Sequence, residues 1–254
     1  MKLTKRTILI TGGTSGIGLE MAKQLLTRDN VVIVTGRDQS KLDQAKRALP
    51  SLHIVKSDVS DPAAIKALEA EVVARFPALD ILINNAGIMR NLKLNDSRDL
   101  EDVTREIEVN LSGPVRMVQQ FLPHLKSRKE ALIVNVSSGL AFIPLPVSPI
   151  YSATKAAIHS YTQSLRVHLK GTRVSAVELA PPGTETPLFR GEFEAEMNGQ
   201  KGMDVSLLVK KAITGIEAGK LEIRPGLSNV LKLMSRVAPK FMLGQLVRMS
   251  TPKL

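Results

Sequence analysis

Two hydrophobic patterns alternate along the 254 residues of the chain. Runs of four to seven residues, rich in Val, Ile and Leu, have the length and composition of buried parallel strands. Longer stretches carry apolar residues every three or four positions, which is the period of a helix with one buried face. The predicted strands are residues 7–11, 31–35, 52–56, 81–84, 131–136, 173–179 and, more weakly, 221–224. The predicted helices are residues 17–27, 41–49, 63–76, 100–126, 151–170 and 205–218.

This alternation predicts an α/β protein with a doubly wound parallel sheet of about seven strands, in a single domain that spans residues 1–254. A barrel of eight βα units is the alternative, but the sequence offers no eighth strand. Hydrophobic residues make up 43% of the chain and charged residues 23%, which is typical of a globular domain and excludes disordered or fibrous classes.

Cysteine is absent, and the four histidines, at positions 53, 124, 159 and 168, lack the spacing of metal ligands. We therefore expect neither a disulfide nor a metal site. The apolar run after the basic N-terminus is too short for a signal peptide, and no other run approaches the ~20 apolar residues of a membrane span. These features predict a cytoplasmic protein.

The net charge of +11 is concentrated near the C-terminus, where residues 201–254 hold ten Lys and Arg against three acidic residues. Aromatic residues are only 3% of the chain, so the stacking platforms that bind single-stranded nucleic acid are missing and no nucleic-acid partner is expected. Residues 226–254 form a basic amphipathic extension. We expect it to pack on the domain or on a second subunit, and contact with an anionic membrane surface is the alternative. The apolar residues close to one helical face are Val230, Leu231, Leu233, Met234 and Val237.

A glycine-rich segment, Thr11-Gly12-Gly13-Thr14-Ser15-Gly16-Ile17-Gly18, follows the first strand and opens the first helix. Glycines at such a turn let the backbone approach a pyrophosphate, whose charge the N-terminus of the helix favours. The spacing is not that of the general dinucleotide fingerprint, and a phosphate loop of the Walker type is excluded because no Gly-Lys-Ser/Thr follows. The predicted cofactor contacts in this segment are Gly12, Thr14, Ser15, Gly16, Ile17 and Gly18.

The end of the second strand predicts which nicotinamide cofactor is bound. NAD sites usually place a carboxylate there to accept hydrogen bonds from the ribose 2′-OH, whereas a 2′-phosphate favours a cation. Here Gly36 occupies that position and Arg37 follows. We therefore predict NADP(H), with NAD(H) as the less favoured cofactor. In the alternative interpretation, Arg37 is a solvated surface residue and Asp38 caps the next helix.

Tyr151 and Lys155 are spaced i and i+4, so a phenol and an ammonium group share one face of a helix. A neighbouring cation stabilises a phenolate, which would lower the pKa of Tyr151 toward working pH and make it a proton donor and acceptor. Ser138 follows the fifth strand, at the edge of the sheet where such folds bind ligands. Asn110 is polar within an apolar helical stretch, and a local kink or a satisfied core amide is its alternative interpretation.

In order and spacing, these motifs resemble the classical branch of the short-chain dehydrogenase/reductase family from residue 7 to about residue 224. The resemblance implies a Rossmann fold in which Tyr151 is the acid/base, Lys155 binds the nicotinamide ribose, Ser138 holds the substrate oxygen and Asn110 orders a water that leads to Lys155. The further cofactor contacts that it implies are Asp58, Val59, Asn84, Ala86, Gly87, Pro182, Gly183 and Thr186, together with Tyr151 and Lys155.

The segment 181–186 departs from the family pattern by a double proline and by Glu185, while it keeps Pro182, Gly183 and Thr186. The double proline and the residues 106–110 also resemble a bacterial branch of the family named after D-alanyl lipoteichoic acid synthesis. Such a resemblance does not identify a substrate, because one fold supports many functions.

Together the motifs predict an NADP(H)-dependent oxidoreductase that interconverts a carbonyl and an alcohol on a small-molecule substrate, as a homodimer or homotetramer. A catalytically idle nucleotide-binding sensor and a membrane-peripheral protein are the alternatives. Residues 187–203, where glycines flank acidic residues, are predicted to close over the substrate as a lid. His159 and Tyr161 are expected to be packing or surface residues. The predicted walls of an apolar substrate pocket are Met89, Leu140, Phe142, Ile143, Val147 and the segment 187–203.

Overall fold

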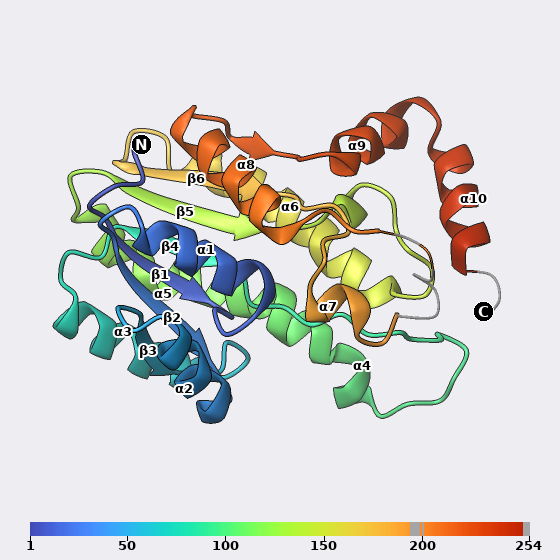
Figure 1. Ribbon diagram of the computed structural model, residues 1–254. Helices are drawn as coiled ribbons and strands as arrows, with labels where there is room; N and C mark the ends of the chain where they lie inside the picture. The colour runs from blue at the N-terminus through green and yellow to red at the C-terminus, as the bar shows by residue number, and fades with distance from the viewer. Residues whose placement is uncertain (194–198, 200, 251–254) are drawn as a thin grey trace.

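The computed structural model describes residues 1–193, 199 and 201–250. Within these residues, seven parallel strands form one sheet in the order β3-β2-β1-β4-β5-β6-β7 (Figure 1). The chain runs outward from β1 in one direction and then from β4 in the other, so the order reverses between these two strands. The doubly wound parallel sheet is therefore confirmed. The strands are β1 (Thr7–Thr11), β2 (Val31–Gly36), β3 (His53–Lys56), β4 (Ile81–Asn84), β5 (Ala131–Val136), β6 (Val174–Leu179) and β7 (Glu222–Ile223).

Helices cover both faces of the sheet, which explains why the strands are apolar throughout rather than alternating. Ile8 and Ile10 of β1 pack against α1, α2 and α8, whereas Leu9 points to the other face and packs with α3, α5 and α6. The helices on the two faces are α1 (Gly16–Leu26), α2 (Gln39–Ala48), α8 (Val205–Glu217), α3 (Pro62–Arg75), α5 (Gly113–Lys126) and α6 (Pro149–His168).

The helix predicted over residues 100–126 is not continuous. It consists of α4 (Leu100–Ile107), one turn of π-helix, η1 (Glu108–Ser112), and α5. Pro114 has no N–H to donate to the carbonyl of Asn110, so the regular hydrogen-bond ladder cannot pass this point. Gly113 N donates instead to Glu108 O, five residues earlier. The local kink considered for Asn110 is thus present, and π-turns of this kind are frequent at functional sites.

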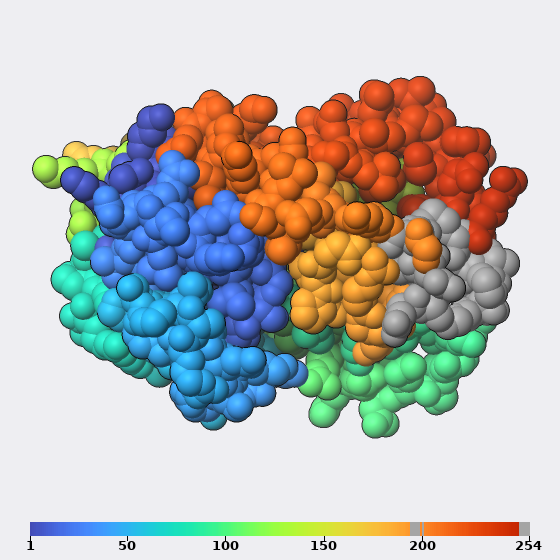
Figure 2. Space-filling model, in the orientation of Figure 1, coloured from blue at the N-terminus to red at the C-terminus, as the bar shows by residue number. Residues whose placement is uncertain are grey.

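The remaining elements lie beyond the carboxyl ends of the strands, at one end of the molecule (Figure 1). Here a third apolar cluster forms, separate from the two on the faces of the sheet, and Leu231 and Leu246 of the C-terminal helices pack into it. The tail therefore packs on the domain, although Figure 2 shows that its helices still stand out from the body as a distinct bulge. These elements are the short η2 (Gly139–Ala141), α7 (Pro187–Arg190), α9 (Leu227–Val237) and α10 (Pro239–Ser250).

None of the helices in the described part of the chain combines the length and the apolar character that a membrane crossing requires.

Candidate functional site

A cavity of about 900 Å³ lies at the carboxyl edge of the sheet, where doubly wound folds bind their ligands. One end of it is lined by the turns after β1, β2 and β3, and we call it the cofactor end. The other end is lined by apolar residues that follow β5 and β6 and by the C-terminal helices, and we call it the substrate end. Ser138, Tyr151 and Lys155 lie on its wall as well.

The glycine loop has the tight geometry that its sequence predicts. Gly12 has φ +65° and Gly16 has φ +52°, a backbone region that side chains disfavour. A Cβ at Gly12 would lie 2.7 Å from the Cα of Ala86. The loop is also clamped from the side, because Asn85 Nδ2 donates to the carbonyls of Thr11 and Gly12 at 3.0 Å each. The turn after β4, through the Asn85 side chain and the Ala86 backbone, therefore holds the glycine loop in place.

Most residues predicted to contact the cofactor line the cavity, and three predicted site residues do not. Gly18 lies behind the loop, where an added Cβ would come within 2.4 Å of the Gly12 oxygen. Asn84 is buried, and its Nδ2 donates to Asn135 Oδ1 at 2.9 Å, so it joins two strands. Asn110 is buried beneath the wall. The predicted residues that line the cavity are Gly12, Thr14, Ser15, Gly16, Ile17, Arg37, Asp58, Val59, Ala86, Gly87, Ser138, Tyr151, Lys155, Pro182, Gly183 and Thr186.

The segment after β2 was interpreted either as a cofactor contact at Arg37 or as a helix cap at Asp38, and the structure shows features of both. Asp38 caps α2, because its side chain accepts a hydrogen bond from Lys41 N. Arg37 nevertheless lines the cavity, and Lys41, which the sequence argument did not consider, lines it as well. An added Cβ at Gly36 would lie 3.0 Å from the Cγ2 of Thr14, so the glycine also keeps this corner open. Arg37 and Lys41 thus border the cavity at this point together with Asp38, while Gly36 occupies the position of a strand-end carboxylate.

Tyr151 and Lys155 project from α6 into the middle of the cavity, as their i, i+4 spacing predicts. Tyr151 is 6% exposed and Lys155 is 4% exposed. Ser138, the N-cap of η2 directly after β5, lies near enough to the Tyr151 hydroxyl to influence its pKa. Lys155 Nζ lies 5.4 Å from the centre of the Tyr151 ring and donates to the carbonyl of Val136 at 2.9 Å. Three polar groups from two elements thus meet at one point.

The protonation of this cluster differs from the sequence-based expectation. Burial raises the pKa of Tyr151 to about 12, although the nearby Ser138 side chain acts in the opposite direction. Burial also lowers the pKa of Lys155 to about 8. The sequence argument had Lys155 lowering the pKa of Tyr151, but the loss of water around the phenol dominates and the charge of Glu106 adds to the rise. Tyr151 is therefore a neutral phenol and a proton donor at neutral pH.

Asn110 lies beneath the cavity wall and connects the turn after β4 to the helix that carries Tyr151 and Lys155. Its amide spans the turn after β4, because Nδ2 donates to Ile88 O at 2.8 Å and Oδ1 accepts from Ile88 N at 2.9 Å. Nδ2 also lies 3.3 Å from Thr154 Oγ1, on the helix that carries Lys155. The π-turn of η1 thus directs a side chain that ties the wall of the cavity to α6.

The polar groups around Gly87 suit a nicotinamide cofactor. A Cβ at Gly87 would lie 3.3 Å from Asn110 Oδ1 and 3.6 Å from Lys155 Nζ, so a ligand can approach these groups only because residue 87 is a glycine. An ammonium group has three N–H donors, and Lys155 Nζ uses one of them on Val136 O. At the other end, the Ser15 side chain forms no cap hydrogen bond, which leaves the first N–H groups of α1 available to a phosphate.

The substrate end was only partly predicted. Met89, Leu140 and residues of the segment 187–203 line the cavity as expected. Ile143 and Val147 instead lie in the apolar cluster behind the wall, with Phe142 packed against that cluster. The sequence argument missed Leu227, Leu231 and Leu246, which line the cavity from α9 and α10. Their helical period shows an apolar face, but it cannot show what that face covers.

The described parts of the predicted lid are anchored to the domain. Phe193 is fully buried in the third apolar cluster, and Glu192 accepts a hydrogen bond from Asn91 N at 2.8 Å. Gly202 N donates to Glu185 Oε1, so the unusual Glu185 fixes the far end of the segment. Of the acidic residues in this prediction, Glu194 and Glu196 lie outside the described residues. Closure over a substrate stays a prediction.

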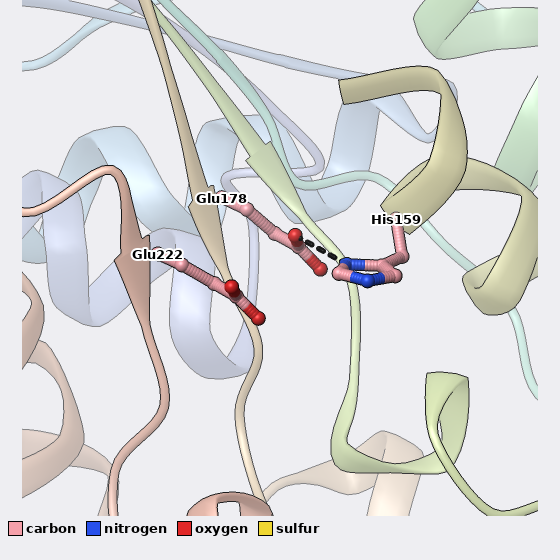
Figure 3. A group of neighbouring side chains, drawn as sticks. All are labelled: His159, Glu178 and Glu222. Atoms are coloured by element: carbon pink, nitrogen blue, oxygen red, sulfur yellow. Dashed lines mark hydrogen bonds and ion pairs between the residues drawn. The ribbon is translucent and has the colours of Figure 1, made fainter. Parts of the chain in front are cut away.

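Figure 3 shows that His159, Glu178 and Glu222 point toward one another from α6, β6 and β7, and their ligand atoms lie within 4.8 Å of one another. Each is already engaged by the protein. His159 Nδ1 is 2.7 Å from Glu178 Oε2, and Glu178 Oε1 accepts from Ser137 Oγ. Lys232 Nζ donates to Glu222 Oε1 at 2.6 Å. The group is therefore a network of hydrogen bonds and ion pairs that joins β6 and β7 to the C-terminal tail, and it agrees with the expectation that His159 is a packing residue.

Comparisons with known proteins extend these observations. DltE of Bacillus subtilis (strain 168), an uncharacterized oxidoreductase, is 42% identical over 224 residues, which cover 88% of this chain and 89% of DltE. The NADP-dependent 3-hydroxy acid dehydrogenase YdfG of Escherichia coli (strain K12) is 33% identical over 68% of this chain and 71% of its own.

Among solved structures, the 3-ketoacyl-(acyl-carrier-protein) reductase of Brucella melitensis, complexed with NADH, superposes with a TM-score of 0.79 at 28% identity, over 89% of this chain and 100% of that chain. The similarity to DltE confirms the bacterial branch that the sequence resembled. The family model of the short chain dehydrogenases matches residues 6–197. On its sequence, its fold and these matches, the chain belongs to the short-chain dehydrogenase/reductase family of oxidoreductases.

Proposed function

We propose that the protein is an NADP(H)-dependent oxidoreductase that interconverts a carbonyl and an alcohol. The observation that carries this proposal is the buried phenol of Tyr151, which shares the cavity wall with Ser138 and lies beside Lys155. A nucleotide-binding sensor without catalysis would need the glycine loop and Arg37, but it would not need this cluster.

Each residue of the cluster has a distinct task in the reducing direction. When bound, the nicotinamide cofactor supplies the hydride. The Tyr151 hydroxyl, which is protonated at neutral pH because burial raises its pKa to about 12, donates the proton to the carbonyl oxygen as negative charge develops there. Ser138 donates a hydrogen bond to the same oxygen. Lys155 holds the ribose and provides the positive charge that stabilises the phenolate left on Tyr151.

The preference for NADP(H) rests on Arg37 and Lys41, which border the cavity after β2 where Gly36 leaves no carboxylate. A 2′-phosphate carries close to two negative charges, and a guanidinium can meet it with two parallel donors. Among the similar proteins, YdfG is NADP-dependent whereas the Brucella reductase was solved with NADH, so family membership does not choose between the two cofactors. The local residues favour NADP(H).

The substrate class follows from the lining of the substrate end. Leu140, Phe189, Leu231 and Leu246 enclose it, and such a surface favours a medium-sized hydrophobic ketone or aldehyde over a small polar one. Activity of YdfG on 3-hydroxy acids adds one defined class of alcohol to test.

The experiment is a turnover panel. Purified protein is incubated with NADPH and a series of carbonyls of increasing chain length, and with NADP⁺ and 3-hydroxy acids, while the absorbance of the reduced cofactor is followed. We expect NADPH oxidation to be fastest with apolar carbonyls and several-fold slower with NADH. Tight NADPH binding without turnover of any carbonyl or alcohol in the panel would instead support the sensor.

A further inference from the structure

The helix α9 does not bury its most apolar side. With 3.6 residues per turn, all of its apolar residues except Leu231 fall within an arc of about 120°. Four of them are largely exposed, namely Leu227 at 57%, Val230 at 46%, Leu233 at 62% and Val237 at 71%. The neighbouring arc faces the domain and carries Ser228, which is fully buried, and Leu231. The expectation that the apolar face packs therefore holds for Leu231, whereas the rest of this face points outward.

Specific polar contacts fix this orientation. Lys232 Nζ donates to Glu222 Oε1 at 2.6 Å and lies 4.9 Å from the centre of the Phe142 ring. Ser228 packs so closely on η2 that a Cβ at Gly139 would lie 2.7 Å from its Oγ. A rotation that buried the apolar arc would break the ion pair and separate these close-packed residues. The outward direction of the apolar arc is thus built into the fold.

Exposed apolar and basic residues continue from α9 into α10. Phe241 is 60% exposed and Leu243 is 37% exposed, while Arg236, Lys240 and Arg248 are exposed as well. Residues 226–254 contain five Lys and Arg and no acidic residue. We call the exposed apolar and basic side chains of α9 and α10 the outer tail face. In Figure 2 these helices form the bulge at one end of the molecule.

The charge of the outer tail face decides what can cover it. A closed twofold contact between two copies would place the same patch against itself, so its cations would face one another with no carboxylate between them. An anionic lipid surface offers both partners that the face lacks, because the headgroups neutralise Lys and Arg and the upper acyl chains receive apolar side chains. From this complementarity we infer that the outer tail face docks the protein on an anionic lipid bilayer.

Docking in this orientation has a consequence for the cavity. Leu227 is part of the outer tail face and also lines the substrate end. The mouth of the cavity therefore opens beside the docked surface, where an apolar carbonyl dissolved in the bilayer can reach it. This consequence rests on the proposed function, whereas docking itself is independent of any turnover.

Co-sedimentation with vesicles tests docking directly. The full chain is mixed with vesicles of phosphatidylglycerol and phosphatidylcholine in equal parts, and with vesicles of phosphatidylcholine alone. We expect binding to the anionic vesicles only, weakened at high salt because screening shortens the reach of the charges. The variants Val237→Glu and Phe241→Glu should bind at least tenfold more weakly. Val167→Glu is the matched control, because Val167 is also on a helix and 61% exposed, and it should bind as wild type does.

A second set of variants separates charge from apolar contact. Arg236→Gln and Lys240→Gln keep the apolar side chains, and each should weaken binding to anionic vesicles about fivefold, the effect of roughly one cation near a charged membrane. NADPH titration of every variant verifies that the cofactor end is intact. The inference is overturned if wild type ignores anionic vesicles or if the Glu variants bind them normally. It is also overturned if sedimentation velocity shows that Val237→Glu splits a stable oligomer, since the outer tail face would then be covered by a second copy.

Discussion

The cofactor end and the substrate end of the cavity are built by different means. The cofactor end consists of short turns that directly follow β1, β2 and β3, and much of it is backbone held by glycines and by the Asn85 amide. The substrate end consists of apolar side chains from four separate segments, including helices almost 100 residues after the Ser138 turn. The difference teaches that a cofactor site can be specified by local sequence, whereas a substrate site in the same cavity depends on how distant elements pack.

The largest effect is expected where the two ends meet. Tyr151→Phe keeps the ring and removes only the proton, so turnover should fall about 10²- to 10⁴-fold while NADPH affinity stays within twofold of wild type. Tyr161→Phe is a matched control, since Tyr161 is the other tyrosine and lies on the same helix. Steady-state kinetics and a fluorescence titration measure the two quantities. Turnover by Tyr151→Phe near the wild-type rate would contradict the assignment of the acid.

The second prediction concerns the free energy of unfolding, which should change when Lys155 is replaced. Burial lowers its pKa from 10.5 to about 8, so the charged form destabilises the folded protein by about 3 kcal/mol at pH 7. Lys155→Met removes this cost but leaves Val136 O without its donor, which costs about 1 kcal/mol. We therefore expect the cofactor-free variant to be more stable than wild type by about 2 kcal/mol at pH 7, and to be nearly inactive.

The stability difference between Lys155→Met and wild type should shrink as pH rises. Below pH 8 the ammonium is charged in both the folded and the unfolded chain, and the full cost is present. As pH rises from about 8 toward 10.5, the folded protein loses the proton before the unfolded chain does, so wild type should gain stability relative to Lys155→Met. Urea unfolding at pH 7 and pH 9.5 tests this, with the exposed Lys170→Met as control. An advantage of Lys155→Met that does not shrink with pH would show that burial of the charge is not its cause.

Substitutions at Arg37 and Gly36 test the cofactor end alone, through the affinities for NADPH and NADH. Arg37→Ala should weaken NADPH binding about ten- to a hundredfold, since a charge-assisted contact of roughly 1.5–3 kcal/mol is lost, and should leave NADH unchanged. Gly36→Asp should go further, because its carboxylate repels the 2′-phosphate and its Cβ crowds Thr14 Cγ2 at 3.0 Å. Arg47→Ala is the control, because Arg47 is exposed and lies on α2, the helix that follows Arg37. Equal affinity of wild type for NADPH and NADH would remove the preference for NADP(H).

The smallest effect is expected at the substrate end. Leu246→Ala widens the cavity from α10 and should raise KM for apolar carbonyls about fivefold, within the range for lost apolar contact in a pocket, without a change in NADPH affinity. Leu243 lies on the same helix but is 37% exposed and does not line the cavity, so Leu243→Ala should match wild type. If Leu246→Ala weakens NADPH as much as the carbonyl, the two ends are not separate sites.

The sequence predicted the sheet closely because buried parallel strands carry a local pattern. All seven predicted strands begin and end within one residue of the observed ones, and β1 and β4 match at both ends. The interruption of the helix around Asn110 was not predicted, because the loss of one hydrogen bond at Pro114 leaves the helical period of the side chains unchanged. Asn84 was assigned to the cofactor by resemblance, whereas its amide in fact joins β4 to β5.

By itself the sequence determined the glycine loop, the residue after β2 and the spacing of Tyr151 and Lys155, because each depends on neighbours within one turn of backbone. Tertiary structure decided the protonation of that pair, since burial is a property of the packed cavity. It also decided the direction of the tail. The apolar period of α9 shows that the helix has a hydrophobic arc, but only the contacts of Ser228 and Lys232 with distant elements turn that arc outward.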